Sequence, residues 1–135
     1  MKYTSELYSL TLISTATALM WVPYVTARMT TFGVMRAIGV RGPDYPTDAP
    51  WADRARRAHI NAIENLAVFA PLVLVSAMIE LSTRVTVLSA QIYVVARLAH
   101  YIIYVAGIPV LRTVAFLAGA CATLTIAMEL LARAR

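Results

Sequence analysis

Long apolar runs alternate with short polar connections along the chain. Four of these runs approach or exceed the about 20 residues that an α-helix needs to cross the hydrocarbon core of a bilayer. They predict helices at about 7–27, 50–79, 85–105 and 111–131. Because short turns separate the last three helices, we expect consecutive helices to be antiparallel neighbours. The pattern predicts an all-α, up-and-down four-helix bundle that forms one unit over residues 1–135.

The ends of the first two helices carry separate signals. Trp21 and the following Arg28 are typical of a membrane interface at the end of the first helix. The stretch 29–49 is rich in glycine, proline and charge, and it predicts one long loop. Asp48 and Pro50 are typical of a helix start, by capping and by a fixed φ angle. A cleaved signal peptide is the alternative for the first run, but its length and aromatic end favour retention.

Composition narrows the class of protein. Apolar residues make up 60% of the chain and charged residues only 14%, whereas soluble domains are about half apolar and about a quarter charged. So few charges cannot cover a water-exposed surface, which indicates an integral membrane protein in contact with the lipid bilayer. Cys121 is the only cysteine, so no internal disulfide or thiolate cluster is possible, and we expect a buried, small apolar side chain. The chain has no basic patch with interleaved aromatic residues, so we expect no nucleic acid as a partner.

The net charge of +5 predicts an orientation in the membrane. Most basic residues fall on the side that holds the long loop. By the positive-inside rule this loop is cytoplasmic and both termini face outward, which for a bacterial protein means the inner membrane. The basic residues on the loop side are Arg28, Arg36, Arg41, Arg54, Arg56, Arg57 and Arg112.

Polar residues inside the second helix share one face. Arg57, Asn61 and Glu64 fall at i, i+4 and i+7, which places all three on the same side. Charged residues inside a spanning segment usually face the bundle interior or a polar cavity. We therefore expect a buried Glu64 carboxylate with several cations around it.

The third helix repeats this pattern. Arg97, Tyr101 and Tyr104 have the same spacing, and His100 lies next to their face. Both polar sets lie toward the predicted cytoplasmic end. Two further arginines stand at neighbouring helix ends, Arg28 and Arg112.

Two interpretations of this polar cluster stay open. Arg57, Glu64 and Arg97 could form a structural ion-pair network that holds the second and third helices in register. The cations outnumber the carboxylate, however, which favours a site for an anionic ligand. No metal is expected, because His59 and His100 lack the further ligands that a metal site needs.

Three motifs occur in succession along the chain. They are Arg-Ala-His-Ile-Asn-Ala-Ile-Glu-Asn at 57–65, Ala-Arg-Leu-Ala-His-Tyr-Ile-Ile-Tyr at 96–104 and Gly-Ile-Pro-Val-Leu-Arg at 107–112. Together they resemble the MAPEG family, the membrane-associated proteins in eicosanoid and glutathione metabolism, over nearly the whole chain. The resemblance implies a homotrimer of four-helix protomers that binds glutathione between neighbouring subunits near the cytoplasmic face. It further implies a bacterial enzyme like the microsomal glutathione transferases, which serves detoxification and takes glutathione as its cosubstrate.

The resemblance also implies a set of glutathione ligands. Each of these side chains matches a position of the family motifs or lies beside one. Glu64 would meet the ammonium group of the tripeptide, and Arg28 would reach one of its carboxylates. The implied ligands are Arg28, Arg57, Asn61, Glu64, Arg97, His100, Tyr101 and Tyr104.

Arg112 and Tyr104 are the implied catalytic pair, because Arg112 matches the arginine that lies by the thiol in family members. A thiol with a pKa near 8.5 is mostly protonated at pH 7, and lowering its pKa to about 7 requires about 2 kcal/mol of preferential thiolate stabilisation. One arginine and one tyrosine hydroxyl in a site of low dielectric constant can supply that. His100 stands where leukotriene-forming members have a tyrosine, which argues against that narrow specificity.

Three functions remain as hypotheses. The first is a glutathione transferase or peroxidase, in which the glutathione thiolate attacks small lipophilic electrophiles or hydroperoxides. The second is a non-catalytic membrane protein on the same scaffold that binds another anionic ligand or serves in assembly. The third, a small multidrug transporter, is disfavoured because such proteins carry a carboxylate deep in the first helix, and this one has no charge between Glu6 and Arg28.

Overall fold

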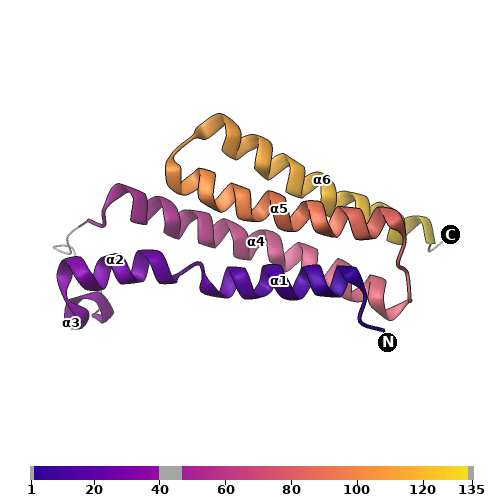
Figure 1. The fold of residues 1–135 in the computed structure, drawn as a ribbon, viewed down its shortest axis with the longest axis horizontal. Helices are drawn as coiled ribbons and strands as arrows, with labels where there is room; N and C mark the ends of the chain where they lie inside the picture. The colour runs from indigo at the N-terminus through magenta and orange to yellow at the C-terminus, as the bar shows by residue number, and fades with distance from the viewer. Residues whose placement is uncertain (1, 40–46, 134–135) are drawn as a thin grey trace.

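The computed structural model describes residues 2–39 and 47–133. Regular structure in these residues is entirely helical, and the chain runs back and forth along one long axis (Figure 1). Four segments are long and apolar enough to cross a membrane, which confirms the predicted all-α bundle: Ser5–Phe32, Pro50–Met78, Arg84–Ala106 and Pro109–Arg133. The helices are α1 (Ser5–Leu19), α2 (Val22–Phe32), α3 (Val34–Ile38), α4 (Pro50–Met78), α5 (Arg84–Ala106) and α6 (Pro109–Arg133).

The last three helices begin and end within two residues of the predicted bounds. Local signals explain this agreement. Thr83 and Thr86 form a reciprocal capping box at the start of α5. Gly107, with φ 80° in the left-handed region, ends α5 and donates its N–H to the carbonyls of Ile103 and Tyr104. Two residues therefore reverse the chain between α5 and α6.

The first span differs from the single helix predicted at 7–27. α1 ends at Leu19 and α2 begins at Val22. Pro23 stands in the first turn of α2, and it has no N–H to bond the carbonyl one turn earlier, so the helix is interrupted there. The break at Met20 and Trp21 divides the span into two helical pieces.

The predicted loop 29–49 is also partly helical. α2 continues to Phe32, and the short α3 follows after Gly33. Asp48 does not cap α4, because the N-cap residue is Ala49 and no side chain caps the helix there. Pro50 does occupy the first helical position as predicted. Residues 40–46 of the loop, which include Arg41, lie outside the described residues.

α5 lies at the centre of the bundle and packs against α1, α4 and α6 (Figure 1). Its Tyr93 ring stacks on Phe69 of α4 with centroids 3.7 Å apart. Val73, Ile13 and Ile126 are buried around this pair. The core is therefore an apolar layer midway along the helices, and the polar clusters lie toward the two ends.

The outer surface of the protomer is largely apolar. Exposed Val, Leu, Ile and Met side chains occur on every long helix, as a surface that contacts lipid or other apolar surfaces requires. Cys121 is exposed on α6, so the expected burial is wrong for the protomer. The buried face of α6 instead carries Ala115, Gly119, Ala122 and Ile126.

Candidate functional site

A cavity of about 250 Å³ lies at the end of the bundle where α4 and α6 begin and α5 ends. Its lining comes from all three helices. Four of the predicted site residues meet in it, together with two that sequence reasoning did not single out. The lining residues are Asn61 of α4, His100 and Tyr104 of α5, and Arg112, Thr113 and Phe116 of α6.

Arg112 and Tyr104 lie against each other at this cavity. The centre of the Arg112 guanidinium is 4.6 Å from the Tyr104 ring centroid, within range of a cation–π interaction. The tight turn at Gly107 brings the first turn of α6 back over the last turn of α5, so these two side chains meet. Among the residues that the structure describes, no carboxylate forms an ion pair with Arg112. Its positive charge is therefore available to the cavity.

His100 forms the inner wall of the cavity. The residue is 4% exposed, and its ring meets the Tyr104 ring edge-on with centroids 5.6 Å apart. Phe116 covers the imidazole from α6, with ring centroids 6.2 Å apart. The Tyr104 ring is thus held between an imidazole and a guanidinium.

The polar face of α4 lies at the edge of this site. Asn61 is half-buried, and its Oδ1 atom has no hydrogen-bond partner within the described residues. Arg57 and Glu64 are exposed on the protomer surface. The expected burial of Glu64 is therefore wrong for a single chain, because the buried face of α4 is the alanine face that includes Ala58 and Ala62.

The structural ion-pair network of Arg57, Glu64 and Arg97 is not formed within the described part of the chain. Arg57 pairs instead with Asp53, one helical turn earlier, at 2.8 Å. Arg97 donates from Nη2 to Oδ1 of Asn65 at 2.7 Å. Helices α4 and α5 are thus joined here by a guanidinium and an amide, and Glu64 takes no part.

Arg97 lies inside the bundle beside the cavity. The residue is 2% exposed, and its guanidinium centre lies 5.3 Å from the Tyr93 centroid and 5.1 Å from the Phe116 centroid. Its Nε and Nη1 atoms have no hydrogen-bond partner among the described residues. Gly119 makes room for it, since a Cβ at that position would be 2.8 Å from the Arg97 Nε atom. Arg97 therefore adds a buried positive charge next to the cavity, from which Phe116 partly separates it.

Two other predicted ligands point elsewhere. Tyr101 donates its hydroxyl to the carbonyl of Met20 at 3.0 Å, at the break between α1 and α2. Arg28 of α2 forms a two-pronged ion pair with Asp48, with N–O distances of 3.1 and 2.6 Å. Both contacts fix α2 against the rest of the bundle, and neither side chain lines the cavity.

Sequence reasoning missed several partners of the site residues. Asp53 and Asn65 each stand four residues from a polar residue of the same face of α4, so their i, i+4 spacing could have indicated them. Thr113 and Phe116 lie in an apolar stretch with no signal of their own. Among residues 2–39 and 47–133, no group of three or more His, Cys, Asp or Glu side chains is placed to hold a metal ion.

The fold and the site define an integral membrane protein whose helical bundle carries a cationic pocket at one end. A protein-family model described as the MAPEG family matches residues 8–132, which is nearly the whole chain. The chain therefore belongs to the MAPEG family, the membrane-associated proteins in eicosanoid and glutathione metabolism. No individually curated protein matches it closely enough to count as a relative.

Proposed function

We propose that the protein is a membrane-bound, glutathione-dependent transferase that also reduces hydroperoxides. The observation that supports this proposal most directly is the contact between Arg112 and Tyr104 at the cavity. Among the described residues, no carboxylate forms an ion pair with this arginine. Glutathione has two carboxylates, one ammonium and one thiol. A pocket with arginine, amide and phenol groups complements such a peptide.

The chemistry follows from the charges at the cavity. Arg112 and the Tyr104 hydroxyl would stabilise the thiolate form of glutathione, which is the nucleophile. In the transferase reaction a carbon–sulfur bond forms as the leaving group departs with its electron pair. In the peroxidase reaction the thiolate takes one oxygen of the hydroperoxide, and a second glutathione completes the reduction to alcohol, water and glutathione disulfide. The apolar surface around the bundle would let lipophilic substrates arrive through the bilayer.

A homotrimer is part of this proposal. Of the implied ligands on α4, Asn61 lines the cavity, whereas Arg57 and Glu64 do not. Arg57 and Glu64 are exposed beside it, where a neighbouring subunit would cover them and complete the ligand set. We infer the same orientation as from the sequence, with this end of the bundle cytoplasmic in a bacterial inner membrane.

Isothermal titration of the purified protein with glutathione tests the proposal. We expect a saturable heat of binding at micromolar to millimolar concentration, and turnover of an activated aryl halide or a lipid hydroperoxide. S-methylglutathione, which has no free thiol, is the matched control and should bind without turnover. Binding without any turnover would favour the non-catalytic alternative, and no binding at millimolar glutathione would remove both the transferase and the peroxidase assignment.

A further inference from the structure

A second cavity lies at the opposite end of the bundle from the candidate glutathione site. It has a volume of about 270 Å³ and lies between the N-terminal segment and the turn that joins α4 to α5. Three membrane-spanning segments begin or end beside it, at Ser5, Met78 and Arg84. This level corresponds to the boundary between hydrocarbon and water, where lipid headgroups lie. The lining residues are Lys2, Thr4, Ser76, Ala77, Glu80, Leu81 and Ser82.

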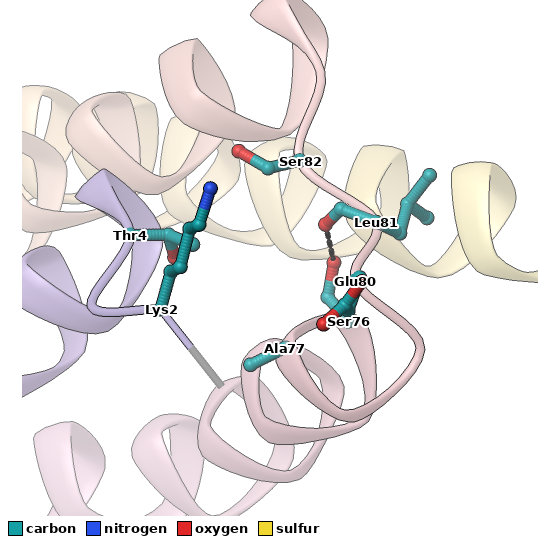
Figure 2. A pocket seen from close by; sticks show the side chains of 7 residues that line it. All are labelled: Lys2, Thr4, Ser76, Ala77, Glu80, Leu81 and Ser82. Atoms are coloured by element: carbon teal, nitrogen blue, oxygen red, sulfur yellow. Dashed lines mark hydrogen bonds between the residues drawn. The ribbon is translucent and has the colours of Figure 1, made fainter.

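The two sides of this cavity carry opposite charges. Figure 2 shows Lys2 and Thr4 on one side and Ser76, Glu80 and Leu81 on the other. Within the described part of the chain, neither Lys2 nor Glu80 forms an ion pair. Both charges are therefore available to a ligand that carries an anion at one end and a cation at the other.

Glu80 is held in an unfavourable backbone conformation. It has φ 56° and is the single non-glycine residue with positive φ among those described. It follows the C-cap of α4, where the Leu81 N–H bonds the Ser76 carbonyl at 2.9 Å and the Glu80 N–H bonds the Ala77 carbonyl at 3.3 Å. Glycine is the usual residue at this position of a helix end. Strained residues of this kind gather at ligand sites, so a carboxylate here favours a binding role.

Two serine hydroxyls belong to the lining of the cavity, Ser76 beside Glu80 and Ser82 toward Lys2 (Figure 2). Ser76 donates its proton to the Leu81 carbonyl at 2.6 Å. Ser82 donates its proton to the buried carboxylate of Glu6, at 2.9 and 3.1 Å from the two oxygens. With their protons engaged, both hydroxyls can only accept further hydrogen bonds. Ser76 therefore adds an acceptor beside Glu80, which suits a hydrogen-bond donor that carries positive charge.

The contacts of Glu6 hold Ser82 and the start of α5 in place beside the cavity. Glu6 is 2% exposed and also accepts a hydrogen bond from Thr86 at 2.6 Å. These bonds join the first turn of α1 to the first turn of α5. The cavity is thus bounded by fixed elements, and its acceptor groups are held in place before a ligand arrives.

We propose that this cavity binds the headgroup of a zwitterionic phospholipid with a primary ammonium, phosphatidylethanolamine. The ammonium donates to Glu80 and to the Ser76 oxygen, and the phosphate accepts from the Lys2 ammonium. The cavity of about 270 Å³ has room for a phosphoethanolamine group. A choline headgroup has no N–H to donate, and a glycerol headgroup has no cation for Glu80.

Native mass spectrometry of the full chain tests this proposal with phosphatidylethanolamine, phosphatidylcholine and phosphatidylglycerol of identical acyl chains. We expect preferential retention of phosphatidylethanolamine. Glu80→Gln should weaken that retention roughly twofold to fivefold and leave phosphatidylglycerol unchanged, whereas Lys2→Gln should weaken both. Glu129→Gln removes a charge outside the cavity and should change neither. Equal retention of the three lipids by the unmodified protein would overturn the proposal.

A second variant separates binding from folding. Glu80→Gly removes the carboxylate and also relieves the positive φ, so we expect a raised melting temperature together with loss of the lipid preference. Unchanged preference in this variant would contradict the assignment of Glu80. Free phosphoethanolamine distinguishes the two sources of the headgroup. If the protein retains the lipid in a millimolar excess of free phosphoethanolamine, the cavity is a lipid site. Binding of free phosphoethanolamine without retention of the lipid would overturn that assignment.

Discussion

Arg112 and Arg97 are both cations of the candidate site, but their surroundings differ. Arg112 is half-buried and lines the cavity, so it can approach a ligand directly. Arg97 is buried between two aromatic rings and bonded to Asn65, so it acts on the cavity through its field and through packing. A substitution at either position should therefore have a different result.

Arg112→Ala should lower kcat roughly a hundredfold while changing the affinity for glutathione much less. A cation that stabilises the developing thiolate is needed most in the reaction itself, and losing one such group costs about 10²-fold to 10³-fold. Steady-state kinetics with an activated aryl halide measures this, and Arg112→Lys should keep part of the rate. Arg133→Ala, on the exposed last turn of α6, is the control. Full activity in Arg112→Ala would refute the catalytic role.

Gly119→Ala should destabilise the protein by about 1–3 kcal/mol, as expected for overpacking a filled core. The added Cβ would lie 2.8 Å from the Arg97 Nε atom and 3.0 Å from its Cζ atom, and the guanidinium is confined by aromatic rings on both sides. Thermal unfolding in detergent measures the change. Gly39→Ala is the matched control, because its Cβ would have only ordinary contacts of 3.4 Å or more. Equal stability of the two variants would contradict the close packing.

At the scale of whole helices, the sequence is informative where a local signal begins or ends a helix. Pro50 and Thr83 begin helices and Gly107 ends one, and the predicted bounds of the three later helices lie within two residues of those observed. The break after Leu19 was not predicted, because Pro23 lies inside an apolar run that looks continuous. For the site, spacing predicted which polar residues share a face of a helix. It could not predict which face packs inward, since burial of α4 depends on its alanine face meeting neighbours that are distant in sequence.

Tyr101→Phe should destabilise the first span by about 1 kcal/mol and leave glutathione binding unchanged. The lost hydroxyl bonds the Met20 carbonyl, which the break between α1 and α2 leaves without a helical partner. Thermal unfolding gives the stability, and titration with glutathione gives the affinity. Tyr8→Phe, at an exposed position of α1, should alter neither quantity. A marked loss of affinity in Tyr101→Phe would instead restore Tyr101 to the set of ligands.

The two ends of the helical bundle have different roles in the proposed function. One end gathers Asn61, His100, Tyr104 and Arg112 around the cavity. The other end holds a buried carboxylate and a turn that fix α1, α4 and α5 together. A rigid distal end would keep the helix ends at the cavity in register, and neighbouring subunits of the proposed trimer would complete the ligand set.

Mixed assembly of two variants, each of which lacks one site residue, tests whether neighbouring subunits share the site. Glu64→Ala removes a group on α4, and Arg112→Ala removes one on α6. Suppose that each site combines α4 of one subunit with α6 of the next. With equal co-expression, about half of the sites then have an unmodified α4, and about half of those also have an unmodified α6. About a quarter of the unmodified activity should therefore return. If both groups serve one site within a single subunit, mixing restores nothing. Each variant expressed alone is the control, and cross-linking of the mixed preparation measures co-assembly, so that absent activity in co-assembled trimers would refute a site that pairs Glu64 of one subunit with Arg112 of the next.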